Sequence, residues 1–196
     1  MFSAYVLSTK CVFWPKNGPV PGWPVNGYVF VYDFGPDPSF GPPSRDLLQR
    51  IENGDLKGFV SAHVLHDVAH RLMTLEACQT FGWPYSGIAQ RLRRHPLEIQ
   101  KLHRFRQALD EILGIGVQVL PVSAGDVLLA GDLSRTHGLL SGDALILAVM
   151  QNCGVTNLAS SDADFDRAPG ITLRPALRLR NESTMDYLVS ISPSAG

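Results

Sequence analysis

The sequence is poor in cysteine, and this shortage excludes several kinds of protein. Its three cysteines are spread widely over 196 residues and none belongs to a CxxC pair. We therefore expect neither a disulfide framework nor a zinc ribbon. The N-terminus also lacks a basic start followed by an unbroken apolar run, so no secretory signal is predicted. These features favour a protein of the reducing cytoplasm.

Long apolar runs and strong net charge are missing as well. The longest apolar stretch, residues 139–150, is interrupted by Ser141, Gly142 and Asp143 and is too short to span a bilayer. The formal net charge is -1, so a surface that binds nucleic acid must be local. Apolar residues nevertheless make up 45% of the chain, which is enough to fill the core of a soluble domain.

Short strands that alternate with helices predict an α/β fold. Strand composition occurs at residues 28–32, 57–60, 117–120, 156–159 and 171–173. Helices with a serine N-cap are predicted to begin at Ser44, Ser61, Ser123 and Ser141. Two further helices are predicted over residues 86–94 and 97–113, separated by Pro96. This order implies a three-layer α/β/α domain with a mostly parallel central sheet.

The distribution of proline and glycine suggests three parts. Residues 1–25 form an irregular N-terminal extension, residues 26–175 the domain, and residues 176–196 a tail. Prolines in the extension include Pro19, Pro21 and Pro24. We expect this segment to form neither a helix nor a central strand, because proline lacks the backbone donor that both require.

Aspartates follow two of the predicted elements. Asp143 lies in the first turn of the helix that starts at Ser141, where a lone acid would only complement the helix dipole. Asp162 and Asp164 come just after the strand at 156–159. Ligands of parallel α/β sheets bind at the carboxyl ends of the strands. We therefore expect these acids to belong to one site.

Two other interpretations of the acidic segment fail on spacing. An EF-hand loop that starts at Asp162 would need glycine and glutamate where the chain has Arg167 and Leu173. A phosphatase of the haloacid-dehalogenase type needs its acids directly at the strand end, but Ser160 and Ser161 intervene. These serines are expected to cap the turn rather than to contact phosphate.

Two motifs resemble a known family. Residues 139–148 have the pattern Leu-x-x-x-Asp-Ala-Leu-x-Leu-Ala, and residues 160–165 the pattern Ser-x-Asp-x-Asp-Phe. Together they are similar to the PIN domain family and, within it, to the VapC-type toxins of toxin–antitoxin pairs. Residues 44–54 and 61–72 also look like that family, so the resemblance covers most of residues 26–175.

The resemblance implies a function and a set of partners. It implies a PIN fold and an endoribonuclease that uses Mg²⁺ or Mn²⁺, with Asp143 and Asp162 as metal-binding catalytic acids and Asp164 as an auxiliary one. Asp67 stands where the family usually has glutamate, which makes it a further catalytic and metal-binding candidate. The implied partners are RNA, a cognate antitoxin and a second copy of the chain.

The first acid of the family, which closes the first strand, has no obvious counterpart. A strand at residues 5–7 would put Ser8 in its place, and a second register would put Asn26 there. If residues 28–32 are the strand, Asp33 ends it, and only this register offers a carboxylate. We therefore predict Asp33 as the first catalytic, metal-binding acid.

Aspartates suit the implied reaction because Mg²⁺ and Mn²⁺ prefer oxygen ligands, neutralise phosphate charge and activate water. Several carboxylates packed together repel one another unless a cation joins them. His63, Asp67 and His70 share a helix face, and a transition-metal site there is the alternative to an ordinary solvated surface.

A basic segment within residues 86–113 is the candidate RNA-binding surface. Its cations are Arg91, Arg93, Arg94, Lys101, Arg104 and Arg106. A solvated helical surface and a dimer or antitoxin interface are the competing interpretations. A rival function also stays open, because a PIN-like module without its first acid would bind or regulate without cleaving.

Overall fold

The computed structural model describes residues 22–35, 37–160 and 162–174. Its strands are β1 (Trp23–Pro24), β2 (Gly58–Ser61), β3 (Gln118–Leu120), β4 (Asn157–Ala159) and β5 (Thr172–Arg174). Its helices are α1 (Gly27–Phe34), α2 (Gly41–Glu52), α3 (Ala62–Phe81), α4 (Ile88–Arg94), α5 (Pro96–Ile99), α6 (Arg104–Gly114), α7 (Ala124–His137), α8 (Ser141–Asn152) and the 3-10 helix η1 (Ala163–Arg167).

All strand pairs are parallel, as predicted. One group has the order β1-β2-β3, and β4 pairs with β5. A parallel bridge between Val25 and Ala159 joins the two groups, so the strands lie in the order β3-β2-β1-β4-β5. The chain order therefore reverses between β1 and β4.

Pro24 lies in the middle of this sheet, which contradicts the expectation that its segment forms no central strand. The Trp23 N–H donates to the carbonyl of Lys57, just before β2, at 2.8 Å, and the Val25 N–H donates to the carbonyl of Phe59 in β2 at 2.7 Å. Pairing with β4 begins only at Asn26, whose N–H donates to the Ala159 carbonyl at 3.1 Å. Pro24 is tolerated because it occupies the one position of β1 where no donor is used.

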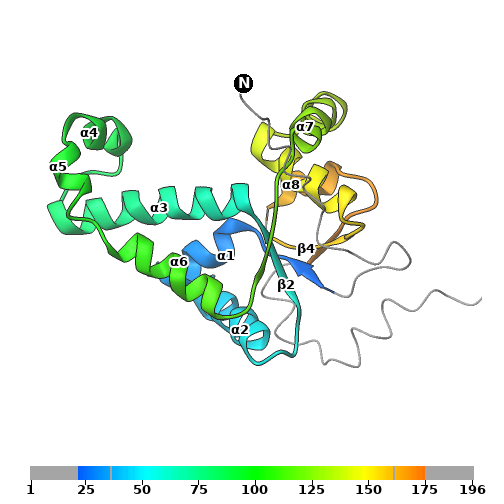
Figure 1. Cartoon of the computed structure of the whole chain (residues 1–196), viewed down its shortest axis with the longest axis horizontal. Coiled ribbons are helices and arrows are strands. Elements are labelled where there is room, and N and C mark those ends of the chain that lie inside the picture. Colours follow the sequence, from blue (N-terminus) through cyan, green and yellow to red (C-terminus); the bar gives the residue numbers. More distant parts are fainter. Residues whose placement is uncertain (1–21, 36, 161, 175–196) are drawn as a thin grey trace, which may run out of the picture.

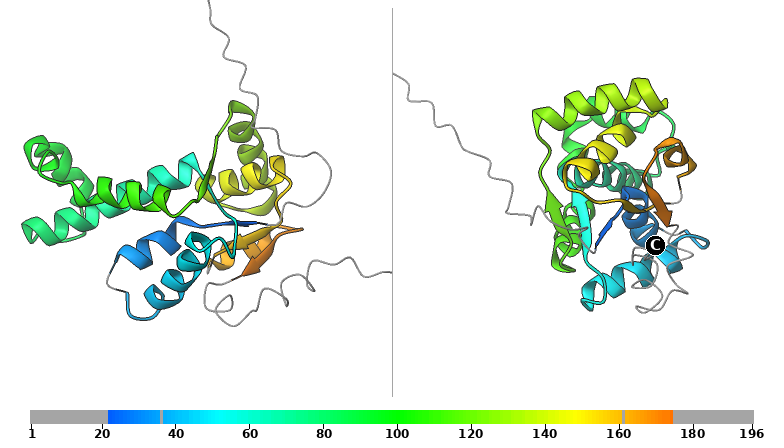
Figure 2. Two further views of the ribbon diagram at one scale, coloured as in Figure 1. Left: turned by 60° about the horizontal axis from the view of Figure 1, so that its bottom comes forward. Right: turned by 90° about the vertical axis from the view of Figure 1, so that its right-hand side faces the viewer.

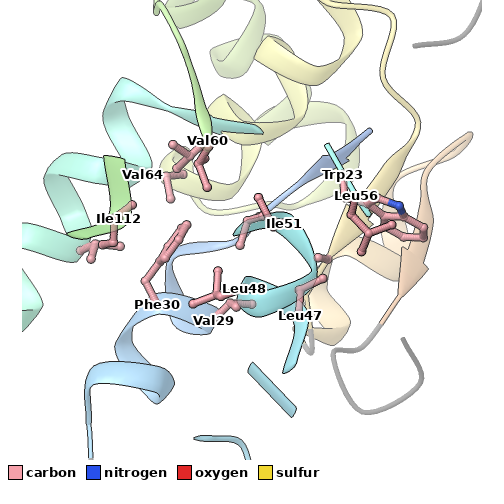
Figure 3. Packing of buried hydrophobic residues seen from close by; sticks show 14 of the residues in the cluster. Trp23, Val29, Phe30, Leu47, Leu48, Ile51, Leu56, Val60, Val64 and Ile112 are labelled. Atoms are coloured by element: carbon pink, nitrogen blue, oxygen red, sulfur yellow. The ribbon is translucent and has the colours of Figure 1, made fainter. Parts of the chain in front are cut away.

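Helices cover both faces of the sheet. The left view of Figure 2 shows the strands between α7 and α8 on one side and α1 and α2 on the other. The largest core lies beneath α1, α2, α3 and α6, where Phe30 is fully buried beside Val64 and Ile112 (Figure 3). The predicted three-layer α/β/α fold is confirmed.

The strand predicted at residues 28–32 is wrong, because these residues belong to α1. Asn26 caps the helix by accepting a hydrogen bond from the Tyr28 N–H at 3.1 Å. Tyr28 and Tyr32 then stack one helical turn apart, with ring centroids 5.8 Å from each other. Val29 and Phe30 are buried in the core. Tertiary packing and the cap override the strand preference of these side chains.

One predicted helix start is displaced. The helix assigned to begin after Ser44 begins at Gly41, with proline in its first turn, and Ser44 is buried inside it. Proline is favoured there because the first helical N–H groups have no partner within the helix. Helix α8 begins at Ser141, as predicted, and Leu140 is the residue before it at the N-cap position. The serine caps at Ser61 and Ser123 are confirmed.

Residues 73–105, which we call the arm, extend from the end of α3 that lies away from the sheet (Figure 1). The arm has a small core of its own, formed by Ala77, Ile88, Leu92 and Leu102. Within the described residues, no helix is long and apolar enough to cross a membrane.

A buried carboxylate shapes the arm. Glu76 accepts hydrogen bonds from the backbone N–H groups of His103, Arg104 and Phe105, at 2.9, 3.0 and 3.0 Å. These donors lie at the start of α6, so Glu76 acts as its cap from a different helix. This is why the single helix predicted over 97–113 is broken into α5 and α6.

Helices α7 and α8 are tied by Asp126. Its carboxylate accepts hydrogen bonds from the N–H and hydroxyl of Ser123 at the start of α7. It also accepts one from the amide of Asn152 at the end of α8. Burial would raise the pKa of Asp126, but these hydrogen bonds outweigh it and lower the pKa. The pair that carries Asp143 is thereby held as one unit.

Candidate active site

The candidate site lies where the strand order reverses. Asn26 follows β1 and Ser160 follows β4, the two strands that meet at this reversal. Such a switch point opens a crevice at the carboxyl ends of the strands and is the usual ligand site of open α/β sheets. The acids after β4 were predicted to stand at a strand end, and they do.

The hydroxyl of Ser160 fixes the two strand ends to each other. Ser160 is only 3% exposed, and its Oγ accepts a hydrogen bond from Asn26 Nδ2 at 3.0 Å. The backbone N–H of Asp162 donates to the same oxygen at 3.1 Å. The expectation that Ser160 caps the turn is correct, and Ser161 lies outside the described residues. The contact with Asn26 is a role that the sequence did not suggest.

Asp33 does not stand at this site. It lies in the last turn of α1, and its Oδ1 accepts a hydrogen bond from Arg45 Nε at 3.0 Å. The prediction of Asp33 as the first acid assumed a strand over residues 28–32 and is wrong for that reason. Asn26 occupies the end of β1 instead, and Ser8 lies outside the described residues. The position after the first strand thus carries an amide.

The pKa of Asp143 is shifted by the charges of the other acids at this site. Burial raises the pKa of its carboxyl above the ordinary 3.8, and the charge of Asp162 raises it further. The charges of Asp164 and Asp67 also raise this pKa, whereas Arg71 lowers it. Side chains from α3, α8 and the segment after β4 therefore share one electrostatic field, which is negative around Asp143.

Asp162 and Asp164 are held by local contacts. Asp162 caps η1, and its Oδ1 accepts a hydrogen bond from the Asp164 N–H at 2.9 Å. Asp164 forms an ion pair with Arg167, which also donates to the Gly138 carbonyl at 2.8 Å. Asp164 is therefore engaged in joining η1 to the α7–α8 turn, and Asp162 is the better placed of the two to act on a ligand.

Asp67 reaches the site from α3 together with a histidine. His63 Nε2 lies 3.4 Å from Asp67 Oδ2. The same nitrogen would lie 3.5 Å from a Cβ built on Gly142, at the start of α8. His63 therefore fills the space between the first turns of α3 and α8. His70 instead lines a cavity further along α3.

Arg71 is a site residue that the sequence did not reveal. Its guanidinium lies 4.6 Å from the centroid of the Tyr28 ring, close enough for a cation–π contact. Its charge lowers the pKa of Asp143, which places it within the field of the acids. Arg71 follows Asp67 by one helical turn, but a single arginine on an amphipathic helix carries no signal in the sequence.

The carboxylate oxygens at this site suit a hard divalent cation, although the acids that the structure describes do not form a ready-made set of three or more ligands around one position. Over the described ranges, no group of three or more His, Cys, Asp or Glu side chains is arranged to hold a metal ion. The transition-metal site considered for His63, Asp67 and His70 is therefore not formed. Mg²⁺ commonly takes one or two carboxylates and keeps several waters. Asp143 and Asp162 offer such carboxylates, and their repulsion is what a cation would relieve.

The basic residues of the predicted RNA-binding segment, residues 86–113, divide into two groups. Lys101 pairs with Glu98 at 2.8 Å, Arg106 pairs with Asp110, and Arg104 donates to Gln79 at 3.3 Å. Arg91, Arg93 and Arg94 lie on α4 and are exposed. Arg91 also lies 5.5 Å from the centroid of the Trp83 ring.

Comparison with known proteins identifies the family. The PIN domain profile matches residues 29–171. The chain belongs to the PIN domain family. Relatives of this PIN domain include a VapC ribonuclease of Mycobacterium bovis and ribonuclease VapC13 of Mycobacterium tuberculosis. Each is 36% identical to it over 129 residues, which are 65% of this chain and 80% of the relative.

Solved structures agree with this PIN fold. VapC20 of Mycobacterium tuberculosis, a Sarcin–Ricin loop cleaving toxin, superposes with a TM-score of 0.53 and 21% identity, covering 79% of this chain and 100% of VapC20. VapBC2 of Rickettsia felis, solved with a promoter DNA fragment, gives a TM-score of 0.50 and 16% identity, covering 78% and 96%. The resemblance to VapC-like PIN proteins drawn from the sequence is confirmed.

Proposed function

We propose that this PIN domain is a metal-dependent endoribonuclease and the toxin of a toxin–antitoxin pair. The observation that carries the proposal is the convergence of acids where the strand order reverses: Asp162 follows β4, Asp143 lies in the first turn of α8, and His63 contacts Asp67 on α3 and lies next to Gly142 at the start of α8. Burial and then the charge of Asp162 raise the pKa of Asp143, in line with this arrangement. Carboxylates that destabilise one another are retained at a strand-end crevice when a cation offsets their repulsion. The relatives that are 36% identical carry the name of VapC ribonucleases.

The side chains have separable tasks in this proposal. Asp143 and Asp162 would hold Mg²⁺ or Mn²⁺, with Asp67 beside them. When bound, such an ion would supply activation of a water and neutralisation of charge on the phosphodiester. Arg71, one helical turn after Asp67 on α3, would offer positive charge that can orient a phosphate. Ser160 and Asn26 hold the ends of β4 and β1 in register, so that Asp162 keeps its place.

The proposal includes partners and a location. We infer that the substrate is RNA, that a cognate antitoxin inhibits the enzyme, and that two copies associate. VapBC2 of Rickettsia felis, a structural neighbour, is itself a VapB–VapC pair by its name. A reducing cytoplasm suits a chain with three widely spaced cysteines and no CxxC pair.

Asn26 favours a second candidate function, that of a PIN module that binds RNA or a partner without cleaving. An amide at the end of β1 offers one carbonyl oxygen, and that oxygen already caps α1. A carboxylate at the same place would bring another negative charge to the site. The identity of residue 26 therefore separates a working nuclease from a degenerate one.

Cleavage of a labelled structured RNA tests both functions. The wild-type protein is expected to cut in Mn²⁺ or Mg²⁺ and to stop in chelator. Asn26→Asp is expected to increase the rate by about tenfold or more, because one added ligand or charge contributes on the order of 1.4 kcal/mol. If the wild type cuts nothing in either metal and Asn26→Asp restores cutting, the degenerate module is correct. If neither protein cuts, the nuclease proposal fails.

The basic face of α4 is expected to hold RNA by its charge. Reversal of Arg93 and Arg94 to glutamate should weaken RNA binding and flatten the dependence of log Kd on log salt by up to about 1.4, or ~0.7 for each lost phosphate contact. Arg91 is left in place because it packs on Trp83. Fluorescence anisotropy over a salt series measures the effect.

A matched reversal of Lys57 and Arg135 controls for net charge. Lys57 precedes β2 at the opposite end of the sheet, and Arg135 lies on α7. This pair should leave the salt dependence unchanged. If instead the Arg93 and Arg94 reversal abolishes association between copies while RNA affinity stays the same, the face belongs to a protein interface.

A further inference from the structure

A cavity of about 420 Å³ lies against α3, next to the acids. Its lining residues are Asp67, His70, Arg71, Thr74, Tyr85, Gly87, Ile88 and Ala89. Asp67, Arg71 and Thr74 occupy one face of α3, because they are four and three residues apart. The opposite wall comes from the arm, at the segment that leads into α4. One residue, Asp67, thus belongs both to the cavity and to the acid cluster.

We propose that this cavity holds a nucleotide of the RNA next to the cleaved phosphodiester. This inference rests on the proposed ribonuclease function and extends it by naming where a flanking base is recognised. Tyr85 supplies an aromatic surface for the base, and Arg71 binds the adjoining phosphate. The volume falls within the range of small-ligand sites.

Tyr85 has the exposure that a stacking residue needs. It is 59% exposed, although its aromatic neighbours in the arm, Phe81 and Trp83, pack against each other with ring centroids 4.7 Å apart. An aromatic ring that lines a polar cavity offers a face to any base, and such stacking tolerates sequence variation. Exposed tyrosines alone are common, so the argument depends on what surrounds this one.

Arg71 has the charge and position to bind a phosphate. Its guanidinium rests over Tyr28, which limits its motion. In the described part of the chain, no carboxylate lies within ion-pair distance of it, so its charge is not already neutralised by a close partner. Arg71 lines the cavity together with Asp67, which precedes it by one helical turn on α3 and belongs to the acid cluster. A phosphate at Arg71 would therefore lie between the base site and the acids.

The wall of the cavity includes the start of α4, the helix that carries the exposed arginines. Ile88 and Ala89 line the cavity, and Arg91, Arg93 and Arg94 follow on the same helix. The cavity thus has Asp67 and Arg71 on its α3 wall, and Tyr85 and the start of the basic helix on its arm wall. These residues suit a single-stranded RNA segment. Arg71 and the arginines of α4 would contact its phosphates, and the ring of Tyr85 would stack on a base.

Binding of short single-stranded RNA tests the cavity without cleavage. Fluorescent oligoribonucleotides are titrated by anisotropy into the Asp143→Asn protein, alone and combined with Tyr85→Ala, Tyr85→Phe or Arg71→Gln. Tyr85→Ala should raise Kd about tenfold and Tyr85→Phe less than about twofold, because the ring rather than the hydroxyl does the stacking. Arg71→Gln should lower the salt slope by about 0.7. Phe34→Ala, an exposed aromatic that lines a different cavity, should change neither quantity.

Kinetics on the wild-type background separate this inference from the function. Tyr85→Ala should raise KM for RNA with little change in kcat, and Tyr85→Phe should restore KM. If the wild type cleaves but Tyr85→Ala leaves Kd and KM unchanged, the cavity is not a nucleotide site and the ribonuclease proposal stands. If no protein cleaves but Tyr85→Ala still weakens binding, the cavity stands and the nuclease proposal fails. Equal loss of affinity in Tyr85→Phe and Tyr85→Ala would overturn stacking as the cause.

Discussion

An Asp143→Asn protein is expected to cleave RNA about a thousandfold more slowly than the wild type, because charge stabilisation by a correctly held metal contributes several kcal/mol. The same variant should lose most of the rise in Tm that Mn²⁺ gives the wild type, since binding only to the folded state is what produces that rise. Cleavage assays and thermal melts with metal and with chelator measure the two effects.

The metal-free Asp143→Asn protein should in addition be more stable than the wild type. The pKa of Asp143 is raised in the folded state by burial and then by Asp162, so its ionised form is less favourable in the folded protein than in the unfolded chain. The resulting destabilisation is absent below the ordinary pKa of 3.8 and complete above the raised folded value. The gain in Tm in chelator should therefore be present at neutral pH and vanish in acid.

Asp132→Asn is the matched control for these effects. Asp132 lies on α7 with its side chain 76% exposed, and it makes only a distant pair with Arg135 at 3.9 Å. The same change of charge there should alter neither cleavage nor the response to metal. Full activity in Asp143→Asn, or an equal loss in Asp132→Asn, would contradict the assignment of Asp143.

Substitution of Glu76 by glutamine is expected to lower the free energy of unfolding by about 2–4 kcal/mol, because it removes hydrogen bonds from backbone donors to a buried charge. A glutamine fits the same space but turns one acceptor oxygen into a donor that faces the N–H groups at the start of α6. Urea unfolding measures the loss, and hydrogen exchange of residues 103–105 shows whether the arm opens first.

The effect of Glu76 should depend on pH in a defined direction. Burial would raise the pKa of Glu76, but the N–H groups of Arg104, His103 and Phe105 outweigh it, and the pKa falls below the ordinary 4.5. The stabilisation is therefore complete above 4.5 and lost as the pH falls through the lower folded value. Glu98→Gln, in the same arm but on an exposed pair with Lys101, should cost no more than about 0.5 kcal/mol. A similar small cost in Glu76→Gln would refute the capping role.

The parts of the fold that could be predicted are those with a local cause. Ser61 and Ser123 cap α3 and α7 as expected, because an N-cap depends on a few consecutive residues. Residues 28–32 have strand composition yet form α1, since a cap at Asn26 and burial of Phe30 decide the outcome. The break between α5 and α6 depends on Glu76, which lies on another helix and left no local signal.

The candidate site likewise contains residues that a local motif indicates and residues that depend on contacts between distant parts of the chain. Asp143 and Asp162 could be proposed from the sequence because each belongs to a short motif beside a predicted element. Asp33 was chosen for its charge alone, and the backbone placed it in a helix, paired with Arg45. Arg71 and the bond from Asn26 to Ser160 depend on contacts between distant parts of the chain, and neither could be inferred from neighbours in the sequence.

The bond between Asn26 and Ser160 has a consequence for synthesis. The two residues are 134 positions apart. Until β4 has been synthesised, β1 can pair only with β2. A growing chain folds from its N-terminal end, so α1, α2 and α3 can pack while β4 is still being made. Asp162 takes its place only after that strand has emerged from the ribosome. A nascent chain therefore carries the arm and its basic helix before Asp162 takes its place, and under the proposed function its RNA-binding surface would be complete before its cleavage site.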